Sequence, residues 1–306
     1  MNVSPKKFHH QTSRPDDIVR PPSRLIAPER LPKLLRMVGV HRYDLYTWYT
    51  SWCLSPFQLF IFRFFCAVYL AMALCLGFRY GSHEMAAQFF FFFTYISSFL
   101  LCCYFTLHAW HTFRVTRFTS SYFRRQANRA SPWYLWLLQF LYSGCFVFHV
   151  IVVIIYWTIL YPTVKRKALE GKIELGPVAI FLDVSVHVLP LFFMLAEIIV
   201  NNRFHVYAVE IFQTLLFMAF YTLWMWFGAF IFYLVRDKAW WVYPHFNFVA
   251  RGRAGLYYAI IFFLTLFGFG LMYLLHRLKQ FCSGCIPPEP NPDEYEEQLK
   301  KYEQAC

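Results

Sequence analysis

Six long apolar stretches are the feature of this sequence that most limits how the chain can fold. They cover residues 57–78, 86–108, 133–161, 177–200, 208–234 and 254–275. A helix needs about 20 consecutive apolar residues to cross the hydrocarbon core of a bilayer. The strands of a membrane barrel would be about half as long and would alternate apolar with polar residues, which these stretches do not do. The sequence therefore predicts an all-α, polytopic membrane protein with six transmembrane helices.

The composition agrees with a membrane protein and argues against a nucleic-acid-binding one. Only 15% of the residues are charged, against roughly a quarter in soluble globular domains, and 22% are aromatic. The net charge is +12, but the basic residues cluster between the apolar stretches rather than along one face. We expect membrane lipid as the main partner and no nucleic acid, cofactor or bound metal. The oligomeric state is left open.

The distribution of lysine and arginine predicts how the chain sits in the membrane. With the N-terminus in the cytosol, the cytosolic segments hold nineteen of these residues and the opposite segments nine, as the positive-inside rule requires. Both termini are thus predicted to be cytosolic. We divide the chain into a basic, proline-interrupted N-terminal tail (1–56), a six-helix transmembrane domain (57–280) and a polar, acidic C-terminal tail (281–306). The membrane is the endoplasmic reticulum or the plasma membrane.

Nine cysteines lie mostly inside the apolar stretches and do not form a disulfide framework. Cys282 and Cys285 have a CxxC spacing, but no second pair completes a zinc site. Their place just after the last apolar stretch is compatible with S-acylation or with two ordinary tail cysteines.

Charged residues near the cytosolic ends of the predicted helices have a simple structural interpretation. Arg63 lies about six residues into the first helix, so its long side chain can extend to the membrane surface. Glu197 and Glu210 flank a short cytosolic turn, where they can reach water or pair with Arg203.

Polar residues deeper in the membrane are candidates for function. His187 lies about ten residues from the outer end of the fourth helix, or ~15 Å at 1.5 Å per residue. Asp183, four residues earlier, shares its helix face, so its carboxylate can hold the imidazole tautomer and leave the other nitrogen as a base. Pro190 removes a backbone N–H and opens the helix beside His187. His149 lies near the middle of the third helix. A purely structural hydrogen-bonded pair remains an equal alternative.

The second predicted helix carries hydroxyl groups at a similar depth. Thr94 lies about eight residues from the outer end, and Ser97 and Ser98 continue its polar stripe. A membrane threonine usually bonds to a carbonyl one turn back. Its depth, which matches that of His187, makes Thr94 a candidate nucleophile.

Four short motifs in this order resemble the androgen-induced, androgen-dependent type of six-pass membrane proteins. They are Phe93-Thr94-Tyr95-Ile96, Tyr161-Pro162, His187 with Val-Leu-Pro and Glu197 after it, and Trp241-Val242-Tyr243-Pro244. The resemblance covers about residues 57–280. The better-known members of that family are threonine hydrolases of fatty acid esters of hydroxy fatty acids.

The resemblance implies acyl transfer inside the bilayer. Thr94 would be the nucleophile, His187 the base and Asp183 the residue that orients the imidazole. Ser97 and Ser98 are candidates for contacts with the substrate oxyanion. Arg251 and Arg253, with His245, are candidates to bind the free carboxylate of the substrate, although anchoring to anionic lipid or simple topology is the favoured explanation for them.

Two other classes of function remain open at this stage. In a non-catalytic membrane scaffold or regulator, Thr94 and His187 would be hydrogen-bonding residues between helices. A transporter or channel would need a polar pathway across the bilayer, and six helices with so few buried charges supply little of one.

Overall fold

The described part of the chain is helical. The structure is a computed structural model, which describes residues 51, 53–80, 89–129, 132–171, 176–201, 206, 209–236 and 254–283. Within these residues the only extended pairing is an isolated bridge between Ser51 and Asn201. The elements are α3 (Pro56–Tyr80), a 3-10 turn η4 (Phe89–Phe91), α5 (Phe93–Arg129), α6 (Pro132–Ile155), a π-helical turn η5 (Tyr156–Leu160), α7 (Tyr161–Leu169), α8 (Pro177–His187), α9 (Leu189–Val200), α10 (Val209–Arg236) and α11 (Ala254–Ser283). The predicted all-α fold is confirmed.

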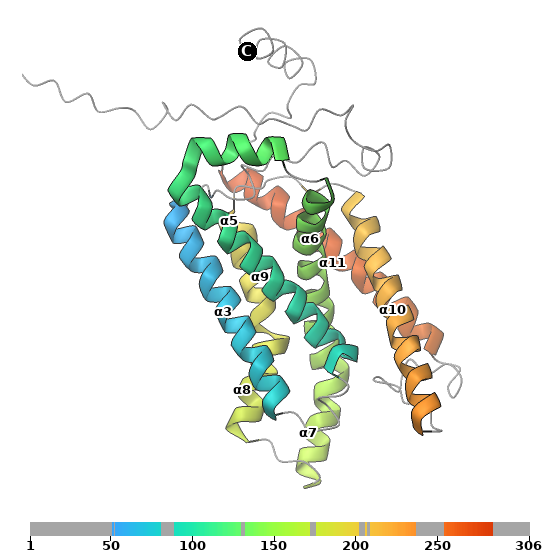
Figure 1. The fold of residues 1–306 in the computed structure, drawn as a ribbon. Helices are drawn as coiled ribbons and strands as arrows, with labels where there is room; N and C mark the ends of the chain where they lie inside the picture. Colours follow the sequence, from blue (N-terminus) through green and yellow to red (C-terminus); the bar gives the residue numbers. More distant parts are fainter. Residues whose placement is uncertain are drawn as a thin grey trace, which may run out of the picture.

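Five helical segments are long and apolar enough to cross a membrane. They are Pro56–Arg79, Leu137–Leu169, Pro177–Val200, Glu210–Val235 and Ala254–Cys282. The sixth long helix, α5, is more polar because five arginines lie in its last sixteen residues. Figure 1 shows the end of α5 bending to lie across one end of the bundle. The chain is therefore an integral, multi-pass membrane protein, and the crossing by α5 stays a prediction.

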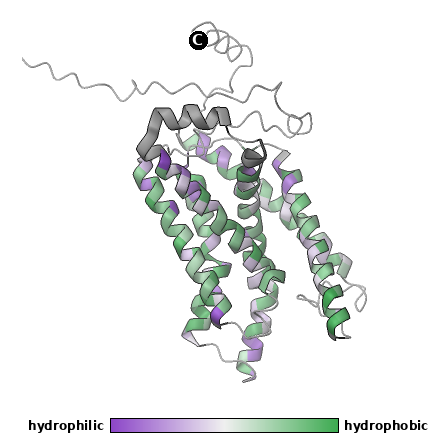
Figure 2. Ribbon diagram, in the orientation of Figure 1, coloured by the Kyte–Doolittle hydropathy of each residue, from purple (hydrophilic) through white to green (hydrophobic). Residues whose placement is uncertain are grey.

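Many large apolar side chains lie on the outside of the bundle, and several polar and charged ones are buried inside it. Phe220 and Phe263 are 61% and 66% exposed, whereas Arg63, His149 and Glu197 are 0% exposed. Figure 2 shows the apolar colouring along the helices. A soluble protein has the reverse distribution, because its outer surface faces water. This arrangement is typical of helices that face acyl chains and turn their few charges inward.

The segment that contains α6 is the central element of the bundle (Figure 1). In an apolar stretch of 18 residues within Leu137–Leu169, 83% of the residues are buried, against 22–33% in the corresponding stretches of the other four spans. Helix α6 contacts α5, α9, α10 and α11, and α3 packs along α5. Side chains on several faces of α6 are therefore buried against neighbouring helices.

Two neighbouring helices are interrupted at the same place in the bundle. Helix α8 ends at His187 and α9 begins at Leu189, with Val188 between them at φ −120° and ψ −56°. This break lies two residues before Pro190, as a proline that lacks its N–H predicts. On the central segment, the Tyr161 N–H donates to the Tyr156 carbonyl across the π-helical turn η5. Such turns often occur at functional sites.

Candidate functional site

The start of α5 determines where Thr94 lies. The sequence predicts a helix from residue 86, but α5 begins only at Phe93, after the η4 turn. Two side chains of α10 hold this turn. The Tyr221 hydroxyl donates to the Phe91 carbonyl at 2.8 Å, and Trp224 Nε1 donates to the Phe90 carbonyl at 2.9 Å. These long-range bonds occupy carbonyl groups that a continuous helix would use itself. Thr94 consequently lies in the first turn of a helix and not in its interior.

The first turn of α5 contains backbone N–H groups without a hydrogen-bond acceptor among the described residues, and two of them belong to Thr94 and Tyr95. The first N–H groups of an α-helix have no intrahelical partner and carry the positive end of the helix dipole. In the described residues, no hydrogen bond uses the N–H groups of Thr94 and Tyr95 as donors. The Thr94 side chain is buried, at 9% exposed. The sequence did not predict these two donors, because it placed Thr94 two turns inside the helix.

Ser97 and Ser98 differ in their partners. Ser97 Oγ donates to the Thr94 carbonyl at 3.0 Å, so its hydroxyl is used within the helix. Ser98 is 1% exposed, and its Oγ has no hydrogen-bond partner among the described residues. Both side chains thus lie inside the bundle one turn from Thr94, and their predicted contact with substrate stays a prediction.

His187 is held in a defined orientation at the C-terminal end of α8. Its Nδ1 donates to the backbone carbonyl of Asp183 at 2.9 Å. The Asp183 Oδ1 atom is farther from Nδ1, at 3.9 Å. The ring of His187 stacks on Tyr156 of η5, with centroids 3.5 Å apart and planes 13° apart. The backbone carbonyl of Asp183, and not its carboxylate, therefore accepts the hydrogen bond from the imidazole N–H in this structure.

The carboxylate of Asp183 instead interacts with tyrosines. The Tyr156 hydroxyl lies beside it, and Tyr95 of α5 is close enough to interact electrostatically. We call Tyr95, Tyr156, Asp183 and His187 the His187 cluster. Tyr95 follows Thr94 directly, and its own ring stacks on Phe89 with centroids 4.1 Å apart. Within the described residues, however, no hydrogen bond joins Thr94 Oγ1 to the His187 ring, and their catalytic pairing stays a prediction.

A second imidazole lies close to His187. His149 is 0% exposed, and its Nδ1 donates to the Cys145 carbonyl at 2.7 Å. Its Nε2 has no partner in the described part of the chain, and its charge would interact with that of His187. His149 therefore lies inside the bundle, and its depth in the membrane stays a prediction.

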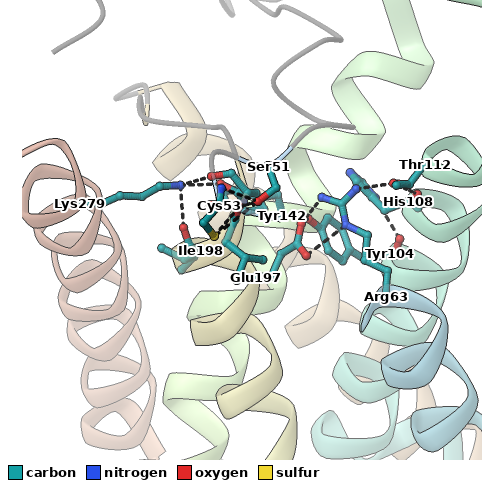
Figure 3. A network of polar contacts seen from close by, with 12 residues as sticks. Ser51, Cys53, Arg63, Tyr104, His108, Thr112, Tyr142, Glu197, Ile198 and Lys279 are labelled. Atoms are coloured by element: carbon teal, nitrogen blue, oxygen red, sulfur yellow. Dashed lines mark hydrogen bonds and ion pairs between the residues drawn. The ribbon is translucent and has the colours of Figure 1, made fainter. Parts of the chain in front are cut away.

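A separate network of polar side chains joins three helices at the other end of the bundle (Figure 3). Arg63 of α3 forms a buried ion pair with Glu197 of α9, in which Arg63 Nε donates to Glu197 Oε2 at 3.1 Å. From α5, Thr112 Oγ1 lies 2.6 Å from Arg63 Nη1, and the Tyr104 hydroxyl donates to Glu197 Oε1 at 3.1 Å. We call these four residues the Arg63 cluster. All four are 0% exposed.

The network continues toward α6 and α11. Lys279 Nζ donates to the Ile198 carbonyl at 2.8 Å, to Asn201 Oδ1 at 2.9 Å and to the Asn201 carbonyl, so it caps the end of α9. Tyr142 of α6 bonds to His276 Nε2 at 2.8 Å and accepts from Asn201 Nδ2 at 3.2 Å. The Ser51 hydroxyl donates to the Val200 carbonyl on the same helix end.

These contacts correct two interpretations made from the sequence. Arg63 does not extend to the membrane surface, because its side chain is fully buried against Glu197. Glu197 pairs with Arg63, 134 residues away. Glu210 is 0% exposed, and its predicted pairing with Arg203 lies outside the described residues. The sequence did contain a signal for the Arg63–Glu197 pair. The two residues carry opposite charges at similar predicted depth in separate helices, and a buried charge is tolerated when it is paired.

A histidine beside the Arg63 cluster stays uncharged. His111 of α5 lies beyond the apolar stretch 86–108 and is 7% exposed. Burial, helped by the positive charges of Arg114 and Arg63, lowers the pKa of His111 to about 4. At neutral pH the imidazole therefore adds no positive charge to a region that already holds Arg63.

Several residues singled out in the sequence lie outside the described residues. They include Arg251, Arg253, His245, Arg203, the Trp241-Val242-Tyr243-Pro244 motif and Cys285, together with most of both predicted tails. In the part that is described, no group of three or more His, Cys, Asp or Glu side chains is arranged to hold a metal ion.

Comparison with known proteins assigns neither a family nor a function to this chain. No family model, no curated protein and no solved structure matches the chain. The function must therefore be argued from the residues of this chain.

Proposed function

We propose that this protein is an intramembrane lipid ester hydrolase in which Thr94 is the nucleophile and His187 the base. The observation that carries the proposal is the hydrogen bond from His187 Nδ1 to the Asp183 carbonyl. A carbonyl oxygen can only accept, so Nδ1 carries the proton, and the Nε2 atom of the neutral ring holds the free lone pair. Stacking on Tyr156 limits rotation of the ring. An imidazole with this tautomer and orientation is what general-base catalysis requires.

The reaction proceeds in two balanced steps. Thr94 Oγ1 attacks the ester carbonyl carbon while its proton passes to His187 Nε2, and the C–O bond to the alcohol breaks as that proton reaches the leaving oxygen. Water then attacks the acyl-threonine ester, gives a proton to Nε2, and releases the fatty acid as the proton returns to Thr94. For the substrate that the family resemblance implies, the products are a fatty acid and a hydroxy fatty acid.

The first turn of α5 offers a means to stabilise the tetrahedral intermediate. Its negative oxygen would need hydrogen-bond donors and positive potential close to the nucleophile. The backbone N–H groups of Thr94 and Tyr95 supply both, because they lie at the N-terminal end of a helix. Catalytic hydrogen bonds often tighten only when substrate binds, so a free enzyme does not need a bond between Thr94 and His187.

A lipid-like fluorophosphonate probe tests this assignment. Purified wild-type protein in a lipid environment is expected to react covalently with the probe, and Thr94→Ala and His187→Ala are each expected to abolish labelling. Thr106→Ala is the matched control, since Thr106 is an exposed threonine of the same helix whose hydroxyl bonds to the Cys102 carbonyl at 2.8 Å.

The outcomes separate the proposal from its rivals. Labelling that persists in Thr94→Ala would exclude Thr94 as the nucleophile. A wild-type protein that does not react at all would favour the alternative, a non-catalytic membrane scaffold or regulator with the same fold.

We further infer that both termini face the cytosol and that the His187 cluster lies toward the opposite side of the membrane. The excess of lysine and arginine in the predicted cytosolic segments supports this orientation. Cys282 is exposed near the end of α11, so in intact endoplasmic reticulum vesicles a membrane-impermeant maleimide is expected to label it without permeabilisation. Labelling of Cys282 only after permeabilisation would reverse the orientation.

A further inference from the structure

Hydrogen bonds account for four consecutive carbonyl groups at the place where η4 changes into α5. The Phe89 carbonyl accepts from the Phe92 N–H at 3.3 Å, as in a 3-10 turn. The Phe92 carbonyl accepts from the Ile96 N–H at 3.1 Å, as in an α-helix. The two carbonyls between them, those of Phe90 and Phe91, accept from side chains of α10. The change in helix type therefore coincides with the two carbonyls that α10 occupies.

The two side-chain donors of α10 take the place of two backbone donors of α5. In a continuous α-helix these carbonyls would accept from the N–H groups four residues later, which are those of Thr94 and Tyr95. Trp224 Nε1 occupies the acceptor of the Thr94 N–H, at 2.9 Å. The Tyr221 hydroxyl occupies the acceptor of the Tyr95 N–H, at 2.8 Å. The described residues supply no other acceptor to the two N–H groups, so both can bond to a substrate oxygen.

A glycine allows η4 to lie this close to α10. A Cβ atom added at Gly228 would overlap the ring of Phe91, so alanine does not fit there. The Phe91 ring stacks on Trp224, with centroids 5.2 Å and planes 14° apart, and its centroid lies 6.2 Å from that of Phe232. A side chain at position 228 would therefore displace the residue whose carbonyl Tyr221 holds.

We propose that Tyr221, Trp224 and Gly228 are positioning residues, which keep the N–H groups of Thr94 and Tyr95 available to the negative oxygen of the reaction. This inference rests on the proposed ester hydrolysis and names the residues that control its oxyanion donors. The three residues act through η4 and need no contact with the substrate. If α10 released the turn, the two carbonyls would regain their helical partners, and the donors would no longer be available.

The amide of Tyr95 can be observed alone, because Thr94–Tyr95 is the only Thr–Tyr pair in the sequence. Threonine labelled with ¹³C at the carbonyl and tyrosine labelled with ¹⁵N select this single amide in an NMR spectrum of the purified protein in detergent. Tyr221→Phe frees the Phe91 carbonyl, so the Tyr95 N–H is expected to regain a hydrogen bond and to exchange with deuterium at least about tenfold more slowly. Unchanged or faster exchange would overturn the inference.

Two control variants separate this effect from a general change in the bundle. Tyr233→Phe removes the hydroxyl of an exposed tyrosine of α10 and is expected to leave the exchange rate unchanged. Gly228→Ala is expected to slow the exchange as Tyr221→Phe does. Gly270→Ala, whose added Cβ would meet nothing within 4 Å in the described part of the chain, is expected to have no effect. Equal slowing in the two alanine variants would overturn the role of Gly228.

Turnover tests whether the contact serves catalysis. Tyr221→Phe and Trp224→Phe are each expected to lower kcat for ester hydrolysis by about a hundredfold with little change in KM, because the donors act on the transition state. Tyr233→Phe is expected to keep the wild-type kcat. A normal kcat in Tyr221→Phe would overturn the inference and leave the hydrolase intact. If the wild-type protein hydrolyses no ester, the proposed function fails, and the exchange rates alone decide whether α10 controls these donors.

Discussion

Replacing Arg63 by methionine is expected to lower the free energy of unfolding by about 3–5 kcal/mol. The change leaves the Glu197 carboxylate 0% exposed, with its ion-pair partner gone and the Tyr104 hydroxyl as a remaining donor. Leaving one charge of a buried pair without its partner is among the most destabilising single changes in a protein. Thermal or denaturant unfolding of the purified protein in a fixed detergent measures the effect.

A double variant and a surface variant complete this experiment. In Arg63→Met with Glu197→Leu, both charges are gone, so most of the lost stability is expected to return. Arg166→Met is the control, because the Arg166–Glu170 pair is exposed and 4.0 Å apart and such pairs contribute about 0–1 kcal/mol. Equal effects of Arg63→Met and Arg166→Met would show that the buried pair does not stabilise the bundle.

Replacing Thr94 by valine is expected to reduce kcat/KM for ester hydrolysis by a factor of about 10³ or more. Valine has nearly the same shape as threonine, so the 9% exposed position stays filled while the attacking oxygen is lost. The measurement is the release of hydroxy fatty acid from its fatty acid ester, followed by mass spectrometry.

Two further variants define what a positive result means. Thr94→Ser keeps a hydroxyl and is expected to retain measurable turnover, whereas Thr106→Val, at an exposed position of α5, is expected to leave the rate unchanged. Melting temperatures of all variants are compared with that of the wild type. Normal hydrolysis by a folded Thr94→Val protein would exclude Thr94 as the nucleophile.

The sequence predicted the positions of most helices well. The stretch 177–200 matches α8 and α9, which run from Pro177 to Val200, and 208–234 matches α10, Val209–Arg236. The break beside His187 followed from Pro190. These features are local, since the length of an apolar run and the missing N–H of a proline act within a few residues.

The start of α5 was wrong by about seven residues for a reason outside the helix. The sequence 86–92 is as apolar as the helix that follows it, so no local signal marks the boundary at Phe93. Tyr221 and Trp224 of α10 bond to the carbonyls of Phe91 and Phe90. This contact between segments about 130 residues apart brings Thr94 into a first helical turn with unused backbone donors.

By itself, the sequence determined that this is an all-α protein with several spans, and it singled out Thr94, Asp183 and His187, because membrane insertion depends on local hydrophobicity. The tertiary structure alone decided which charges meet, as in the pair of Arg63 with Glu197, and which ring stacks on His187, that of Tyr156. Hydrogen bonds, ion pairs and ring stacking depend on distances between helices, and only the packed bundle sets those distances.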